Sequence, residues 1–273
     1  MRDSECVEFL QWALPRLHRR WSGFRKVRRT TCKCIARRLQ ELNLSGAQAY
    51  REFLECNAGE WSALDALLPI TISSFYRDKA VFDFLGTALL PHLAQDAQRH
   101  AARDLRALSI GCASGEEPYT LRLVWQFHVA PVHREISLPI VATDVLPELL
   151  ERARKACYPA SSLKLLPEAW RAQAFEAVAG GYCLRAEYRQ GIEFVQQDVR
   201  TALPDAYFNL ILCRNLVFTY FDESMQRQIL ERLLSRLLSG GALVIGRRET
   251  LPSGTVGFIP WPGAEPRGIF QRR

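Results

Sequence analysis

The sequence predicts a small helical domain at the N-terminus, followed by a larger α/β domain built on a parallel sheet. Two observations carry this prediction. The first hundred residues place apolar side chains at helical spacing and show no strand-like alternation. After Arg103, short apolar segments that end in small or polar residues alternate with amphipathic segments. Strands that alternate with helices imply a parallel sheet covered by helices on both faces.

Four helices are expected in the N-terminal part. The first has an apolar face and a basic face, formed respectively by Phe24, Val27, Ile35 and Leu39 and by Lys26, Arg29, Lys33 and Arg37. Asn43 closes this helix, and Ser45 is a suitable N-cap for a second helix over 47–54. The other two helices cover 60–68 and 79–101. We therefore expect a helical domain over residues 1–70, a linker over 71–104 and the α/β domain over 105–273.

The α/β part is expected to contain four buried strands, over 105–111, 139–144, 207–215 and 242–246. Helices should follow the first three, and they begin at Glu116, Pro147 and Glu223. Between Tyr158 and Asp198 lies an insertion with one helix, over 166–175. The rest of the insertion contains β-rich stretches that split at Gln190-Gly191 like a hairpin.

The composition is that of an ordinary globular protein, with 273 residues, of which 48% are hydrophobic and 24% charged. No apolar run reaches the roughly 18 residues of a membrane span, and the N-terminus lacks the apolar core of a secretory signal. Eight cysteines are scattered without a CxxC pair, so we expect reduced thiols rather than a metal site or disulfides. These features predict a cytoplasmic protein without membrane insertion.

The net charge of +7 is unevenly distributed. Residues 1–40 hold 11 Lys and Arg against 3 Asp and Glu, whereas the remaining residues hold 25 and 26. The basic excess therefore belongs to the N-terminal segment, which could dock on an acidic helical partner. A solvated charged face explains the same residues.

The loop 111–118, GCASGEEP, follows the first strand of the α/β part. Its small residues let the main chain approach a ligand closely, and it opens a helix whose first N–H groups are free. Two acids in the first helical turn would repel a pyrophosphate, so a cationic or zwitterionic ligand fits better. A tight turn between strand and helix would also explain the loop.

Polar residues end the next two strands. Asp144 ends the second strand, where a carboxylate can accept hydrogen bonds from ribose hydroxyls, although it could simply cap the next helix. Together with the loop 111–118, Asp144 favours a ligand that contains adenosine. Arg214 and Asn215 end the third strand beside the same crevice, and a salt bridge with an Asn-initiated turn is the alternative there.

The segment 71–78, TISSFYRD, lies between the two expected domains. Its two aromatic residues and Arg77 could close over a ligand, with the guanidinium holding a carboxylate through two hydrogen bonds. A surface ion pair would be the ordinary alternative for Arg77.

With these motifs in order, the chain resembles the CheR-type protein-glutamate O-methyltransferases of bacterial chemotaxis over nearly its whole length. The most specific stretches are SSFYRD, GCASGEEPYTL, ATDV, CRN with YFD, and LLSGGALVIG. The resemblance implies a class I, Rossmann-like S-adenosylmethionine-dependent methyltransferase domain after the helical domain. It also implies a small antiparallel β subdomain, which we expect at about 176–198.

The resemblance also implies roles for individual residues. Arg77 and Tyr220 would be catalytic, with Asp144 on the cofactor ribose and Asp198-Val199 beside the adenine. Contacts to S-adenosylmethionine are implied for Thr71, Ser73, Arg77, Gly111, Glu117, Asp144, Asp198, Val199, Arg214 and Asn215. No metal is implied. The sequence departs from the family pattern where Asp198-Val199 replaces Asn-Leu and where four residues rather than three separate Asn215 from Tyr220.

The chemistry implied is simple, because a glutamate side chain with an unperturbed pKa of about 4.3 is already an anion at pH 7. Such a nucleophile needs no general base. It needs to be desolvated and positioned against the methyl group, which Arg77 and Tyr220 would do. Two other functions stay open: methyl transfer to another protein or a small molecule, and cofactor binding by a non-catalytic regulator. The Asn/Asp-Pro-Pro-aromatic motif is missing, which disfavours a nucleic-acid methyltransferase. We expect a monomer.

Overall fold

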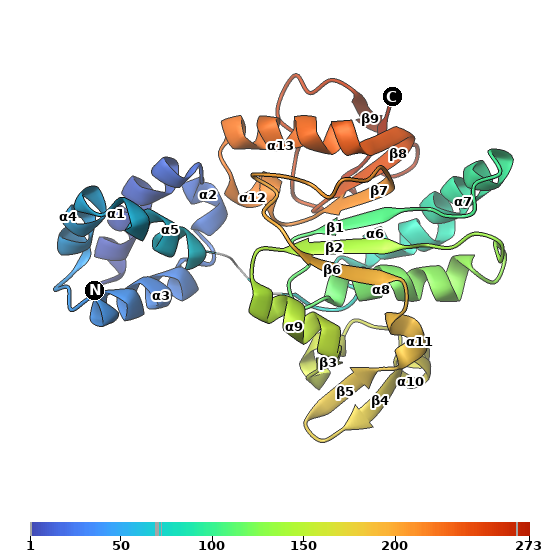
Figure 1. The fold of residues 1–273 in the computed structure, drawn as a ribbon, viewed down its shortest axis with the longest axis horizontal. Helices are drawn as coiled ribbons and strands as arrows, with labels where there is room; N and C mark the ends of the chain where they lie inside the picture. The colour runs from blue at the N-terminus through green and yellow to red at the C-terminus, as the bar shows by residue number, and fades with distance from the viewer. Residues whose placement is uncertain (1, 69–70, 72, 266) are drawn as a thin grey trace. The chain divides into compact units, whose positions relative to one another are not determined.

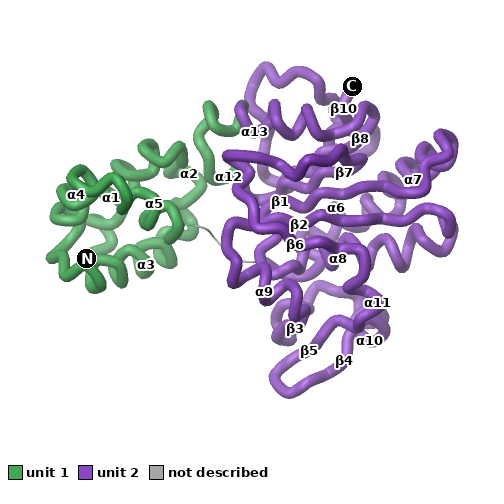
Figure 2. Tube along the Cα trace, in the orientation of Figure 1, with its two compact units in different colours: residues 1–71, 219–227 green, residues 72–218, 228–273 purple. Residues whose placement is uncertain are grey.

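The computed structural model describes residues 2–68, 71, 73–265 and 267–273. The chain forms two compact units, which Figure 2 distinguishes by colour. The helical unit comprises Met1–Thr71 together with Thr219–Arg227, and the α/β unit comprises Ile72–Phe218 together with Gln228–Arg273. A short segment from late in the sequence therefore belongs to the helical unit, which the sequence pattern did not indicate.

The helical unit is built from α1 (Asp3–Ala13), η1 (Leu14–Leu17), α2 (Trp21–Phe24), α3 (Arg28–Glu41), α4 (Ala47–Cys56) and α5 (Ala58–Ala66). Its core is formed by buried apolar side chains such as Phe9, Phe24, Ile35, Tyr50 and Leu64. The apolar side chains predicted to share one helix face do lie in or against this core, but they do not share one helix: Phe24 ends α2, and α3 begins at Arg28. The segment Thr219–Arg227 is attached to this unit by a main-chain hydrogen bond, in which the Arg20 N–H donates to the carbonyl of Tyr220 at 2.9 Å.

The main sheet of the α/β unit has seven strands in the order β6-β2-β1-β7-β8-β10-β9. Their bounds are β1 (Ala107–Ile110), β2 (Ile140–Asp144), β6 (Ile192–Gln196), β7 (Phe208–Cys213), β8 (Leu237–Ile245), β9 (Phe258–Pro260) and β10 (Ile269–Arg272). The first five in that order run parallel, and β10 is antiparallel to both of its neighbours. This confirms the predicted α/β class. The order reverses at β1 and β7, the point where open sheets of this kind bind ligands.

The helices of this unit are α6 (Lys79–Phe84), η2 (Leu85–Leu89), α7 (Leu90–Arg99), α8 (Glu116–Val124), η3 (Trp125–Val129), α9 (Pro147–Lys155), η4 (Ala160–Leu163), α10 (Glu168–Ala174), α11 (Ala186–Arg189), α12 (Val217–Tyr220) and α13 (Glu223–Arg236), of which α12 and α13 continue into the helical unit. The segment expected as a linker over 71–104 contains α6, η2 and α7, whose side chains, among them Val81, Phe82 and Leu89, belong to the main core. Most of the segment 71–104 is therefore part of the α/β unit and not a linker, because the apolar side chains of its helices pack into the core of that unit.

A second, three-stranded antiparallel sheet has the order β3-β5-β4, with β3 (Cys157–Tyr158), β4 (Phe175–Val178) and β5 (Gly181–Leu184). It lies apart from the main sheet (Figure 1). This confirms the expected small antiparallel sheet, and β4 and β5 lie in the first part of the expected range 176–198. The hairpin expected at Gln190-Gly191 is wrong, because β6 pairs with β2 in the main sheet. The Gly191 carbonyl accepts from the Ile140 N–H at 2.9 Å, which leads the chain into that parallel pairing. Alternation alone does not identify a strand's partner.

Two disulfides contradict the expectation that every thiol is reduced. Cys6–Cys32 joins α1 to α3, and Cys157–Cys183 joins the paired strands β3 and β5. In each pair 26 positions separate the two residues, and the fold brings their Cα atoms to 5.9 and 4.0 Å. Only the tertiary structure shows such a pairing. Cys34, Cys56, Cys112 and Cys213 are free thiols.

Candidate functional site

The loop after β1 approaches its neighbours closely at Gly111. Its φ of +71° lies in the left-handed region, and a Cβ there would stand 2.6 Å from Cδ2 of Leu216. The Gly111 N–H donates to the carbonyl of Thr143 at 2.8 Å, which ties the loop to the end of β2. Glycine is therefore required here, because the side chain of Leu216 stands where a Cβ would otherwise lie.

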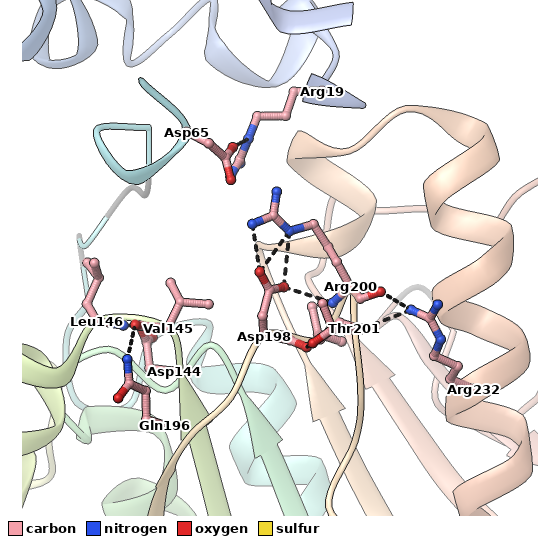
Figure 3. A network of polar contacts seen from close by, with 11 residues as sticks. Arg19, Asp65, Asp144, Val145, Leu146, Gln196, Asp198, Arg200, Thr201 and Arg232 are labelled. Carbon is pink, nitrogen blue, oxygen red and sulfur yellow. Dashed lines mark hydrogen bonds and ion pairs between the residues drawn. The ribbon is translucent and has the colours of Figure 1, made fainter. Parts of the chain in front are cut away.

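Asp144 stands at the carboxyl end of β2 and joins two loops. Its Oδ2 accepts from the Ala113 N–H at 2.8 Å, and its Oδ1 accepts from the Leu146 N–H at 3.1 Å. Figure 3 labels Asp144 and Leu146. The residue at the N-cap of α9 is Leu146, so Asp144 forms a turn before the helix rather than capping it. Burial raises the pKa of Asp144, and the main-chain N–H groups oppose that shift. The carboxylate is thus fixed at the sheet edge by main-chain donors.

Arg214, predicted to line an open pocket, is a buried clamp. Its side chain is 1% exposed, and its guanidinium donates to Oε2 of Glu117 and to Oδ2 of Asp78, both at 2.8 Å. It also donates to the main-chain carbonyl of Arg77 at 2.9 Å. The ion-pair alternative considered for this strand end is therefore the observed arrangement. Arg214 holds Glu117 and the Arg77-Asp78 segment at the end of β7.

The two adjacent glutamates of the loop have different surroundings. Glu117 accepts from the Ser109 hydroxyl at 2.9 Å as well as from Arg214. Glu116 is 3% exposed and is hydrogen-bonded by the hydroxyls of Ser114 and Ser73. Burial raises the pKa of Glu116, against the effect of these hydroxyls. Glu116 therefore stabilises the loop from inside, whereas Glu117 lies among charged groups at the strand ends.

The segment 71–78 does not cover a ligand with its aromatic residues. Phe75 and Tyr76 are buried in the main core, where Phe75 packs edge-on against Tyr158 with ring centroids 4.8 Å apart. The Tyr76 N–H donates to Oγ1 of Thr120 at 3.1 Å. The expectation of an aromatic lid is wrong, because these rings anchor the segment instead. Ser73 and Arg77 are half-buried beside the loop, and Thr71 is exposed and groups with the helical unit.

Asp198 and Val199 follow β6, the neighbour of β2 in the sheet. The Asp198 carboxylate accepts from the Arg200 guanidinium, with an N···O distance of 2.6 Å, and Arg232 donates to the Arg200 carbonyl (Figure 3). Val199 is buried. The Gln197 N–H donates to the Asp144 carbonyl at 3.0 Å, so this turn lies beside the end of β2.

Sequence reasoning missed Glu249, whose carboxylate accepts from the main-chain N–H of Asn215 at 2.8 Å. Asn215 has a φ of +55°, and Glu249 follows β8, the other neighbour of β7. The signal in the sequence was an acid three positions after Gly246, itself directly after a buried strand. Asp78 and Ser109, the partners of Arg214 and Glu117, were missed as well.

Tyr220 belongs to the helical unit, where its ring packs against Phe24 with centroids 5.1 Å apart. Two sets can be distinguished among the predicted site residues. Gly111, Glu117, Asp144, Arg214 and Asn215 gather at the carboxyl ends of β1, β2 and β7. Thr71 and Tyr220 belong to the other unit.

Neither a metal-binding cluster nor a membrane-spanning helix is present among the described residues. No group of three or more His, Cys, Asp or Glu side chains could hold a metal ion within the part of the chain that the structure describes. Likewise, none of the helices described is both long enough and apolar enough to cross a membrane.

Comparison with known proteins gives consistent similarities. The family described as "CheR methyltransferase, SAM binding domain" matches residues 71–262. The chemotaxis protein methyltransferase of Listeria monocytogenes is 34% identical over 186 residues, 68% of this chain and 68% of that protein. The one of Salmonella typhimurium is 30% identical over 225 residues, 79% of this chain and 73% of that protein.

Among solved structures, the N-methyltransferase NodS of Bradyrhizobium japonicum, in complex with S-adenosyl-L-homocysteine, is similar at 17% identity. The similarity covers 59% of this chain and 61% of that one, with a TM-score of 0.31. At that TM-score the likeness supports no conclusion about the site.

Proposed function

The chain belongs to the CheR methyltransferase family and is an S-adenosylmethionine-dependent methyltransferase, and we propose that it methylates glutamate side chains of a chemoreceptor-like protein. The product is a carboxyl methyl ester. The observation that supports this proposal best is the group of Gly111, Glu117 and Asp144 at the carboxyl ends of adjacent parallel strands. That edge, at the reversal of strand order, is where ligands of open α/β sheets bind.

The residues at this edge fit S-adenosylmethionine. Gly111 lets Leu216 pack closely against the loop after β1, and Asp144 presents a carboxylate fixed by main-chain donors. When bound, the cofactor supplies a methyl group on a positively charged sulfonium. The carboxylates of Glu117 and Asp144 suit a cationic ligand that carries ribose hydroxyls. In this proposal Asp144 takes the ribose, and the main chain and side chains of Asp198-Val199 lie along the adenine.

Other residues of the site have supporting roles in the proposal. Ser73, through its hydrogen bond to Glu116, and Arg214, through Glu117, keep the loop in its binding shape. Asn215 forms the turn next to Gly111, since Leu216 is the residue that the glycine accommodates. Thr71 stays a proposed contact that only the family resemblance supports.

The proposed reaction is a positioning task. The glutamate of the substrate is an anion at neutral pH, so no residue of this chain has to remove a proton. Arg77 holds the substrate carboxylate, and Arg214 fixes the Arg77 main chain by donating to its carbonyl. Holding the anion away from water leaves one lone pair for in-line attack. Tyr220 stays a proposed catalytic residue that only the family resemblance supports.

We propose that the substrate docks on the basic face of α3. Arg29, Lys33 and Arg37 are exposed on this helix, whereas Ile35 and Leu39 are buried on its other side. Such a stripe fits an acidic helical surface and would attract it over long range. The proposal includes a monomer that works in the cytoplasm without nucleic acid.

The experiment that tests the proposed function is methyl transfer from radiolabelled S-adenosylmethionine to a lysate of the source cells. We expect label on a protein band that mild alkali releases as volatile methanol, because a methyl ester is hydrolysed and an N-methyl group is not. Alkali-stable label, or label in small molecules alone, would contradict glutamate methylation. Tight cofactor binding without any label would point to a non-catalytic regulator.

A further inference from the structure

The turn after β8 folds a buried carboxylate back onto the end of β7. The Glu249 N–H donates to the Gly246 carbonyl at 2.8 Å, which closes a four-residue turn. The Glu249 side chain is then directed back, and its Oε2 accepts from the Gly246 N–H at 2.5 Å and from the Asn215 N–H at 2.8 Å. Glu249 is 8% exposed. One oxygen therefore joins two turns that 31 positions separate.

Gly246 makes this approach possible. A Cβ at this position would lie 2.7 Å from Oε2 of Glu249 and 2.8 Å from Oδ1 of Asn215. Real Cβ atoms do not come so close to oxygen atoms, so any side chain here would displace the Glu249 carboxylate and the Asn215 amide from their positions. The absence of a side chain at Gly246 is thus part of the same arrangement.

The contact fixes a strained residue. Asn215 has a φ of +55°, in the left-handed region, which costs a non-glycine residue about 1 kcal/mol or more. A hydrogen bond from its N–H to a carboxylate is of the strong, charge-assisted kind. The charge lies close to β7, since Glu249 adds to burial in raising the pKa of the Cys213 thiol.

The effect extends to the loop after β1. Leu216 follows Asn215, and its Cδ2 occupies the space against Gly111 that a side chain there would need. The conformation of Asn215 therefore determines where Leu216 stands, and Leu216 bounds the Gly111 loop. The chain of contacts runs from Glu249 through Asn215 and Leu216 to Gly111.

We propose that Glu249 is a positioning residue for the cofactor site, acting through the main chain of Asn215 and the side chain of Leu216 on the loop at Gly111. This inference rests on the proposed function only in that the loop at Gly111 binds S-adenosylmethionine. It assigns Glu249 no contact with cofactor or substrate.

The test compares Glu249→Ala with Glu249→Gln in the full chain. Calorimetric affinity for S-adenosylhomocysteine should fall at least about tenfold in Glu249→Ala, since both main-chain donors lose their acceptor. Because both donors use the same oxygen, Glu249→Gln retains a suitable acceptor and should bind within about threefold of the wild type. Hydrogen exchange at the Asn215 amide should accelerate in Glu249→Ala and much less in Glu249→Gln.

A matched control separates positioning from stability. Glu60 is also a buried carboxylate, and it accepts from Tyr50 and Arg38 in the helical unit. Glu60→Ala should lower the melting temperature and leave the affinity for S-adenosylhomocysteine within about twofold. If Glu60→Ala weakened binding as much as Glu249→Ala, or if Glu249→Ala bound like the wild type, the proposal would be overturned.

A second pair of variants covers the case in which Glu249→Ala does not fold. Gly246→Ala should separate Glu249 from Asn215 and weaken binding at least about tenfold. Gly59→Ala, in open space on α5, should leave affinity unchanged. If Gly246→Ala and Gly59→Ala bound S-adenosylhomocysteine equally well, the proposal for Glu249 would be refuted and the proposed function would stand. If the wild-type chain did not bind S-adenosylhomocysteine, the proposal and the proposed function would both be refuted.

Discussion

The two units of the molecule use buried carboxylates in different ways. In the helical unit, Glu60 accepts from the side chains of Arg38 and Tyr50, at 2.8 and 2.7 Å. In the α/β unit, Asp144 and Glu249 accept from main-chain N–H groups of turns. The first pattern holds helices against one another, whereas the second fixes the shape of loops at the sheet edge.

The difference explains where a binding site can form. The Glu60 carboxylate serves packing alone, because its partners Arg38 and Tyr50 lie on the helices α3 and α4. A carboxylate bonded to main-chain N–H groups pre-organises a turn, so a ligand that binds there does not have to order it. Substitutions in the two regions should therefore have separable effects on stability and on cofactor affinity.

The largest effect is expected from Arg214→Ala. It leaves the carboxylates of Glu117 and Asp78 without their cation, and breaking a buried ion pair in this way costs about 3–5 kcal/mol in the free energy of unfolding. Urea denaturation of the variant measures this. Arg106→Ala, which breaks the exposed pair with Asp104, should cost less than about 1 kcal/mol. Equal costs would show that the network at Arg214 is not a buried clamp.

Asp144→Ala should weaken S-adenosylhomocysteine binding at least about 100-fold. The variant removes the ribose acceptor and frees the Ala113 and Leu146 N–H groups, and each hydrogen bond to a charged group is worth about 1.5–3 kcal/mol. Calorimetry measures the affinity, with Asp104→Ala as an exposed control in the same unit. An unchanged affinity in Asp144→Ala would refute the assignment of this carboxylate.

Arg77→Ala separates binding from chemistry. Cofactor affinity should stay within about threefold, whereas turnover should fall on the order of 100-fold, the cost of a mispositioned nucleophile. Methyl transfer and calorimetry on the same preparation give both values. Turnover that survives within about threefold would exclude a carboxylate clamp at Arg77.

The carboxylates of the two units should respond to pH in different ways, Asp144 through cofactor affinity and Glu60 through stability. Burial raises the pKa of Asp144, whereas the hydrogen bond from Arg38 lowers the pKa of Glu60. Affinity for S-adenosylhomocysteine is therefore complete above the raised pKa of Asp144 and falls as the pH drops through it, by up to about tenfold per pH unit. The stability that Glu60 contributes persists to lower pH, because its folded-state pKa lies below the unfolded one. Calorimetry should find that the affinity of Asp144→Asn for S-adenosylhomocysteine depends less on pH than that of the wild type.

The smallest effect is expected on the basic face of α3. Neutralising Arg29 and Lys33 together, as Arg29→Gln with Lys33→Gln, should raise KM for the protein substrate about fivefold and leave cofactor affinity unchanged, since exposed charges contribute at most about 1 kcal/mol. The same change at Arg103 and Arg273, both exposed in the α/β unit, is the control. If the difference in KM between the double variant and the wild type persisted in 1 M salt, an electrostatic docking face would be excluded.

The sequence was informative wherever a pattern is local. The order of strands and helices, the glycine at position 111 and the acid at the end of β2 follow from spacing and from residue type. Pairings between distant segments were not accessible: β6 was assigned to a hairpin because alternation does not identify its partner. The disulfides, the clamp at Arg214 and the contact of Glu249 with Asn215 likewise join residues that lie far apart in the chain. Phe75 and Tyr76 looked like a lid because an aromatic pair in a loop does not reveal which core it enters.

The most direct test of the contrast between the two units is hydrogen exchange with and without S-adenosylhomocysteine. We predict slower exchange on binding at 111–117, 144–146 and 213–216, where carboxylates fix the turns that hold the cofactor. The helices over 28–66, whose carboxylates bond to side chains, should exchange as before. Slower exchange in those helices, with no change in the three loop segments, would contradict the proposed contrast between the two units.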